Sequence, residues 1–230
     1  MDRLNRTRLL FGDAAIKKLS SATIMVVGCG AVGSFAIEAL ARSGIGNLIL
    51  IDSDRIEESN INRQLFALDS TINKEKVAVA KQRINDINPR IKVIAKKLFF
   101  DQNTNLEIQP DFVIDAIDTV SSKIALYQWC QSHGIPFISS MGAARKTDPT
   151  KIKIDKLSKT SVCPLASKIR KLVKASALQD FDTVFSTEAV TDSPQGKNFG
   201  SLITVTGTFG LFLANYAIKF ILNHPTQLRQ

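Results

Sequence analysis

An apolar segment that runs directly into a glycine-rich turn most constrains how this chain can fold. Residues 23–27 form a mostly apolar run, and Gly28, Gly30 and Gly33 follow it in a G-x-G-x-x-G spacing. Such a run is typical of a parallel strand that is buried on both faces. The spacing allows a tight turn into a helix whose free amide groups can bind phosphate. Asp52 follows Gly33 by 19 residues, where a dinucleotide-binding unit keeps its ribose-binding acid.

The chain up to residue 140 alternates short apolar runs with amphipathic segments. We expect further strands at 48–51, 91–98, 111–117 and 136–139. We expect helices at 14–19, from the glycine turn to Ser43, from an N-cap at Asn73 to 87, and at 122–132. Strands that alternate with helices of this length predict βαβ crossovers. The predicted fold is α/β, with a Rossmann-like, doubly wound and mainly parallel sheet.

A different pattern begins after residue 140. Residues 151–155 alternate apolar with charged side chains and 183–187 form another short run, which predicts a C-terminal antiparallel extension. Residues 168–174 indicate a basic helix, and 193–200 indicate a mobile loop. The uncharged run at 202–218 is at the lower limit of membrane-spanning length, so we expect a buried helix or a helix at a subunit interface.

Charge and cysteine usage limit the kinds of partner and compartment. Thirty Lys and Arg against 21 Asp and Glu give a net charge of +9, which suits a polyanionic partner but also an ordinary basic enzyme. The three cysteines, Cys29, Cys130 and Cys163, form no C-x-x-C pair, so neither a disulfide framework nor a zinc knuckle is indicated. The first 13 residues lack the apolar run of a secretory signal. We therefore expect a cytoplasmic protein.

Three acids fall at the ends of predicted parallel strands, and they decide which nucleotide the turn would bind. Asp52, Asp54 and Asp118 would meet at one edge of the sheet. Their mutual repulsion requires cations, and Arg63, Lys76 and a bound Mg²⁺ would supply them. That combination describes a triphosphate site better than a dinucleotide site. Asp54 suits the capping of a loop equally well, Asp118 could cap the next helix, and Lys76 could be a solvated helix residue.

The order of these motifs resembles the ubiquitin-activating E1-like family, which adenylates carboxylates with ATP. The motifs are the glycine turn, IDSD at 51–54, SNINRQ at 59–64, Lys76 in a following helix, and DAIDT at 115–119. Within that family the chain is most similar to the branch that modifies tRNA, from about residue 3 to 219. Supporting segments include INRQLFAL at 61–68 and LSKTSVCPLASKIRKLVK at 157–174.

The resemblance implies a role for each residue of the nucleotide site. Asp52 would bind the ribose hydroxyls of ATP, Asn62, Arg63 and Lys76 the phosphates, and Asp118 the Mg²⁺. The full set implied to bind ATP is Gly28, Gly30, Ala31, Gly33, Asp52, Asp54, Asn60, Asn62, Arg63, Gln64, Lys76 and Asp118. Arg63, Lys76 and Asp118 are the implied catalytic residues, together with Arg6 or Arg8, which would reach across a homodimer to the partner's ATP.

The reaction that the resemblance implies is a cyclisation with net loss of water. The carboxylate of N6-threonylcarbamoyladenosine, at position 37 of tRNA, would be activated as an acyl adenylate with release of pyrophosphate. A nitrogen of the same side chain would then close the ring and release AMP. The resemblance also implies a possible partnership with a cysteine desulfurase or sulfur-acceptor system, and we expect no membrane association.

Three other functions compete with this interpretation. Relatives that adenylate ubiquitin-like sulfur carriers commonly hold zinc through two C-x-x-C pairs, which this sequence lacks. An NAD-linked oxidoreductase has no use for the 60–64 loop or for Lys76. A non-catalytic RNA-binding relative would not need the phosphate-binding residues. Cys163 is interpreted as structural, since an intramolecular cyclisation needs no thioester.

Residues 151–174 hold eight Lys or Arg against Asp155 alone. A charge run is usually a solvated face, but its density and the net charge together favour contact with a phosphate backbone. The expected tRNA contacts are Lys168, Arg170, Lys171 and Lys174. We expect one domain over 1–230, with an N-terminal arm at 1–20, a nucleotide-binding half at 21–140, and a tRNA-facing and dimerisation half at 141–230.

Overall fold

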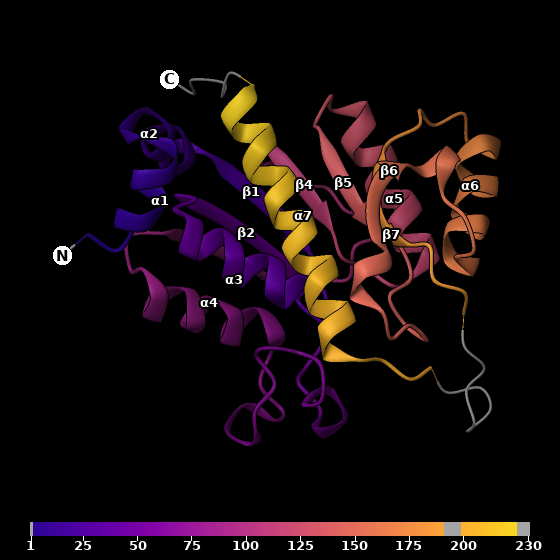
Figure 1. The fold of residues 1–230 in the computed structure, drawn as a ribbon, viewed down its shortest axis with the longest axis horizontal. Coiled ribbons are helices and arrows are strands. Elements are labelled where there is room, and N and C mark those ends of the chain that lie inside the picture. The colour runs from indigo at the N-terminus through magenta and orange to yellow at the C-terminus, as the bar shows by residue number, and fades with distance from the viewer. Residues whose placement is uncertain (1, 191–198, 225–230) are drawn as a thin grey trace.

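The computed structural model describes residues 2–190 and 199–224, and its centre is a seven-stranded sheet with helices on both faces (Figure 1). The sheet order is β3-β2-β1-β4-β5-β7-β6. All neighbouring strands are parallel except β6, which pairs antiparallel with β7. This confirms the predicted mainly parallel sheet with an antiparallel extension. The strands are β1 (Thr23–Val27), β2 (Asn47–Asp52), β3 (Lys92–Lys97), β4 (Phe112–Asp115), β5 (Phe137–Ser140), β6 (Ile152–Lys156) and β7 (Asp182–Ser186).

Alternation along the central strands builds two separate apolar cores. In β1, Ile24 and Val26 pack into one core while Met25 and Val27 pack into the other, because successive side chains of a strand point to opposite faces. Helices α2 (Asp13–Ser21), α3 (Gly33–Ser43), α4 (Lys76–Ile87) and α7 (Ile203–Asn223) cover the first face. Helices α5 (Val120–Ser132) and α6 (Pro164–Ala175) cover the second.

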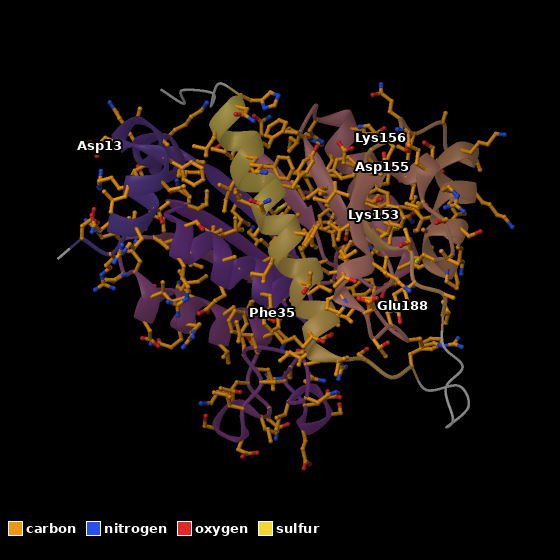
Figure 2. All side chains as sticks on the ribbon, viewed as in Figure 1. Asp13, Phe35, Lys153, Asp155, Lys156 and Glu188 are labelled. Atoms are coloured by element: carbon orange, nitrogen blue, oxygen red, sulfur yellow. The ribbon has the colours of Figure 1, made fainter. Side chains whose placement is uncertain are left out.

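Helix α7 crosses the sheet diagonally and packs on α3 (yellow in Figure 1). It is the one helix of the described residues that is long and apolar enough to cross a membrane, yet 56% of its most apolar window is buried inside the fold. Glycines permit the close approach. A Cβ on Gly210 would lie 2.3 Å from the Val32 carbonyl oxygen, and one on Gly207 would lie 3.2 Å from the Phe35 ring, which Figure 2 labels beside α7. The expected buried helix is confirmed.

Several predicted boundaries were wrong. A further helix, α1 (Asn5–Phe11), precedes α2. Asn73 is not an N-cap: its φ is +64°, its amide donates to the Ile56 carbonyl at 2.8 Å, and Glu75 is the residue before α4. Asparagine tolerates this left-handed conformation, which ends a loop rather than starting a helix. Strand β4 ends at Asp115, short of Asp118. Most of the loop expected at 193–200 lies outside the described residues.

Candidate active site

A cavity of about 800 Å³ opens at the carboxyl ends of the central strands. Strands β2, β1, β4 and β5 are parallel neighbours, so the segments that follow them meet at one edge of the sheet. The cavity brings together most of the predicted nucleotide-binding residues. Those in its wall are Gly28, Gly30, Ala31, Asp52, Asp54, Arg63, Gln64, Lys76 and Asp118.

The three positions of the turn are glycine for different physical reasons. Gly28 has φ +97°, and a Cβ there would lie 2.6 Å from the Ala116 carbonyl oxygen. A Cβ on Gly33 would lie 1.8 Å from the Gly28 carbonyl oxygen, so Gly33 closes the turn and does not line the cavity. At Gly30 the nearest atom to such a Cβ is the Gln64 Nε2, at 3.7 Å. No clash therefore requires a glycine at position 30, and the missing side chain lets a ligand in the cavity approach the backbone.

Asp52 is held by the turn that it faces. The Cys29 amide donates to Asp52 Oδ2 at 2.7 Å, and the Asp54 amide donates to Asp52 Oδ1 at 2.8 Å. Burial raises the pKa of Asp52, and these two hydrogen bonds oppose that rise. Each oxygen has a second lone pair. The carboxylate can therefore accept hydrogen bonds from a ribose diol without losing its fixed orientation.

Lys76 is the first residue of α4, and its side chain enters the cavity wall. Its Nζ donates to Asp54 Oδ2 at 2.8 Å; the Lys76 side chain is 9% exposed and that of Asp54 is 62% exposed. This hydrogen bond lowers the pKa of Asp54. An exposed carboxylate is easily rehydrated, so the ammonium can exchange it for a phosphate oxygen.

Only some of the polar side chains of the 57–64 loop line the cavity. Arg63 Nη1 donates to the Ser59 carbonyl at 2.7 Å, which orients the guanidinium. Asn60 is buried and its Oδ1 accepts the Glu57 amide at 3.2 Å, so it builds the loop. Asn62 donates to the Ser201 carbonyl at 3.4 Å. Neither asparagine lines the cavity, and their contacts with ATP stay predictions.

Asp118 lies exposed in the loop between β4 and α5. Within residues 2–190 and 199–224, no group of three or more His, Cys, Asp or Glu side chains is arranged to hold a metal. Magnesium in nucleotide sites usually takes one or two carboxylates and completes its shell with phosphates and water. Asp118 at the cavity wall therefore fits a Mg²⁺ that arrives with ATP.

A buried polar network below this loop was missed by the sequence reasoning. Asp115 and Lys123 are fully buried, and the Lys123 Nζ donates to Asp115 Oδ2 at 2.7 Å. Tyr127 and Ser139 donate to the same oxygen at 2.8 and 2.6 Å. Asp115 Oδ1 accepts the Ile117 amide at 3.0 Å, which fixes the chain next to Asp118. The available signal was the first acid of DAIDT, inside an otherwise apolar strand.

The two N-terminal arginines differ in their partners. Arg8 donates to Asp2 Oδ2 at 2.8 Å and also pairs with Asp13 of the same chain. Arg6 is exposed, and among the described residues it has no side-chain hydrogen bond or ion pair. Neither arginine lines the cavity of its own chain.

The basic stretch separates into paired and free cations. Lys156 pairs with Asp182 at 3.1 Å and Lys159 with Asp155 at 3.4 Å; Figure 2 labels Lys156 and Asp155 on β6. On α6, Arg170 donates to the Thr160 carbonyl at 2.8 Å and is bound to its own subunit. The remaining predicted contacts are exposed and without ion pairs in the described part of the chain: Lys168, Lys171 and Lys174.

Comparison with known proteins identifies relatives along nearly the whole chain. Residues 4–230 match the ThiF family. The chain is 45% identical over 193 residues to the tRNA threonylcarbamoyladenosine dehydratase of Bacillus subtilis, covering 82% of this chain and 76% of the relative. It is 35% identical over 247 residues to the Escherichia coli enzyme of that name, covering 94% and 92%. The crystal structure of the E. coli enzyme in complex with ATP has a TM-score of 0.90 and 38% identity, covering 96% of this chain and 94% of that chain.

Proposed function

This chain belongs to the ThiF family, and from that premise we propose that it is an ATP-dependent tRNA threonylcarbamoyladenosine dehydratase. The observation that carries the proposal is that relatives of this name match the chain along most of both lengths. The cavity supports it, because its wall contains most of the residues that we predict to bind ATP. One wall provides a hydrogen-bond acceptor for the ribose diol, Asp52, and hydrogen-bond donors for the phosphates, namely the glycine turn, Arg63 and Lys76.

The first step joins the substrate carboxylate to the α-phosphorus of ATP. Asp52 accepts the ribose hydroxyls, and the glycine turn lets the phosphates approach the backbone near Gly30. Lys76 and Arg63 offset the negative charge that develops on the departing pyrophosphate. Mg²⁺, held by Asp118 and the phosphates, would neutralise further charge on the triphosphate.

The second step closes the ring within the substrate. A nitrogen of the threonylcarbamoyl group attacks the acyl carbon, the bond from that carbon to the AMP oxygen breaks, and the nitrogen releases its proton. The net change is loss of one water molecule. Since attacking and attacked groups belong to one side chain, no enzyme nucleophile is required.

The cysteines agree with this route and disfavour a thioester mechanism. Cys29, Cys130 and Cys163 are all buried. Burial raises the pKa of Cys29 and of Cys130, which suppresses their thiolate forms. Cys163 accepts the Ala166 amide at the start of α6 and so has a structural role.

We further propose a homodimer in which Arg6 reaches the partner's ATP. Arg8 is occupied by two acids of its own chain, whereas Arg6 is available. The same helix exposes Leu9 and Leu10 by 72% and 74%, an apolar surface suited to a second subunit. A cytoplasmic location belongs to this proposal too, and the association with a sulfur-transfer system stays a prediction.

Mass spectrometry of the nucleoside tests the function. The protein is incubated with ATP, Mg²⁺ and tRNA that carries N6-threonylcarbamoyladenosine. We expect this nucleoside to lose the mass of one water molecule while AMP and pyrophosphate form. An unchanged nucleoside, with AMP formed only when a ubiquitin-like protein is added, would instead establish the sulfur-carrier adenylyltransferase.

A further inference from the structure

Part of the cavity lies beyond the residues that bind the nucleotide. Its wall consists of residues 141–146, which follow β5, and residues 163–165, at the start of α6; we call these the acceptor half. The two segments pack on each other, since a Cβ on Gly142 would lie 3.3 Å from the Cys163 Sγ. The sheet order β2-β1-β4-β5 places the acceptor half past the Asp118 loop, on the side away from Asp52.

Lys146 is the buried cation of the acceptor half. Lys146 is 3% exposed, and its Nζ donates to the main-chain oxygen of Glu188. The Glu188 carboxylate is occupied elsewhere, because it accepts the amides of Thr147 and Asp148 at 3.0 Å. In the described ranges, no carboxylate lies within ion-pair distance of Lys146.

This environment leaves Lys146 with unused binding capacity. An ammonium group has three N–H donors, and among the residues that the structure describes only the Glu188 oxygen accepts a hydrogen bond from this one. Burial disfavours the charged form and lowers the pKa of Lys146, and the Glu188 carboxylate opposes this only from beyond ion-pair distance. The neighbours Gly142, Ala143 and Ala144 are small and neutral, so they leave room for a ligand, and Arg145 adds a second cation to this wall.

We propose that Lys146 binds the substrate carboxylate that is adenylated, which makes the acceptor half a carboxylate subsite. The inference rests on the proposed function. An anion bound there would place a counter-charge in direct contact with the Lys146 ammonium, in the same cavity as the nucleotide-binding residues.

The same contact serves both half-reactions. One carboxylate oxygen forms the new bond to the α-phosphorus, and the bond from that phosphorus to the bridging oxygen breaks, so pyrophosphate leaves with the electron pair. The second oxygen becomes the carbonyl of the acyl adenylate. When the nitrogen attacks, negative charge develops on that oxygen. The C=O double bond re-forms as AMP leaves. The Lys146 ammonium beside it stabilises the charge.

A neutral variant of similar length tests the subsite. Lys146→Met should bind a non-hydrolysable ATP analogue as the wild type does, but lose on the order of a hundredfold in tRNA-dependent ATP–pyrophosphate exchange. Lys146→Arg, which keeps the charge, should recover part of the loss. Lys92→Met removes an exposed lysine at the far edge of the sheet and should change neither property.

A neutralised substrate gives a second measurement, and its comparison in the wild type does not depend on the variant folding. With the ATP analogue present, the wild type should bind the nucleoside N6-threonylcarbamoyladenosine roughly tenfold or more tightly than its methyl ester. Lys146→Met should bind the two equally.

The outcomes separate this inference from the proposed function. Wild-type protein that leaves the tRNA nucleoside unchanged contradicts the function. An active wild type that binds acid and ester alike overturns the subsite. So does a folded Lys146→Met with normal exchange, or one whose loss is entirely in ATP binding.

Discussion

Lys76 is a nearly buried ammonium whose partner, Asp54, is exposed to solvent. An arrangement of this kind keeps the Lys76 side chain oriented before ATP arrives, and it costs little to exchange the partner for a phosphate. Arg63 is prepared in a similar way by the Ser59 carbonyl. Both side chains are therefore positioned so that, in the proposed reaction, they would stabilise charge without reorganising.

Removing either group should slow adenylation. We expect Lys76→Ala or Arg63→Ala to lower the rate on the order of a hundredfold or more, as the loss of other preorganised charge stabilisers does. Lys81→Ala, an exposed residue of the same helix, serves as the control and should retain full activity. Pyrophosphate release under single-turnover conditions measures the step. Near-normal rates in both variants would show that the phosphates lie elsewhere.

The raised pKa of Asp52 predicts how ATP binding depends on pH. Burial is the largest cause of the rise, so this carboxyl takes up its proton at a higher pH than an ordinary aspartate. A protonated carboxyl accepts ribose hydrogen bonds less well. Affinity for ATP should therefore fall as the pH falls through this pKa and be restored above it. Calorimetric titration at several pH values checks this, and a profile as steep in Asp52→Asn would assign the effect to another group.

At the scale of elements, the crossing of α3 and α7 connects the core to the active site. Gly210 lies against the Val32 carbonyl, and Val32 is the residue before α3 at the end of the glycine turn. The spacing between these two helices therefore also positions the turn that approaches the nucleotide.

Gly210→Ala should separate the two helices. The new Cβ would lie 2.3 Å from the Val32 oxygen and 3.0 Å from the Ala36 nitrogen, which are backbone atoms and cannot rotate away. We expect the free energy of unfolding to fall by about 1–3 kcal/mol, typical of an overpacked core, and ATP affinity to fall with it. Urea unfolding measures the first quantity. Asn215→Ala, exposed on the same helix, is the control; equal stability of the two variants would contradict the close approach.

At the scale of the whole molecule, α6 brings one exposed lysine, Lys168, next to the active site. Lys168 lines a groove with residues 101–103 and with Thr119, and Thr119 also lines the cavity. A phosphate backbone bound along α6 would therefore lead to the cavity where one base must enter. We therefore expect tRNA to bind along α6 rather than along the segment that holds the paired Lys156 and Lys159.

Salt dependence of tRNA binding tests this surface. Replacing Lys168, Lys171 and Lys174 by Ala together should make the negative slope of log affinity against log salt shallower by roughly 2–3, because each phosphate contact contributes somewhat less than one unit. A matched triple variant takes exposed lysines from other elements, namely Lys17, Lys81 and Lys92. Filter binding at several salt concentrations gives the slopes. Equal slopes in the two variants would place the tRNA on another face.

The sequence by itself determined the features that depend on neighbouring residues. The glycine turn, the left-handed Gly44 at φ +98° that ends α3, and Lys76 in the first turn of α4 follow from local sterics and spacing. The continuous apolar run of β1 likewise predicted a strand buried on both faces, and its side chains enter both cores. These features were sufficient to predict the nucleotide fold.

Only the tertiary structure decided which polar residues face the ligand. Asp115 and Asp118 share one motif, yet one is buried with Lys123 and the other is exposed at the cavity. Arg170 is hydrogen-bonded to Thr160. The Lys146 Nζ in the acceptor half is hydrogen-bonded to the main-chain oxygen of Glu188, 42 residues away. Such choices depend on contacts between segments distant in the chain, and local spacing carries no information about them.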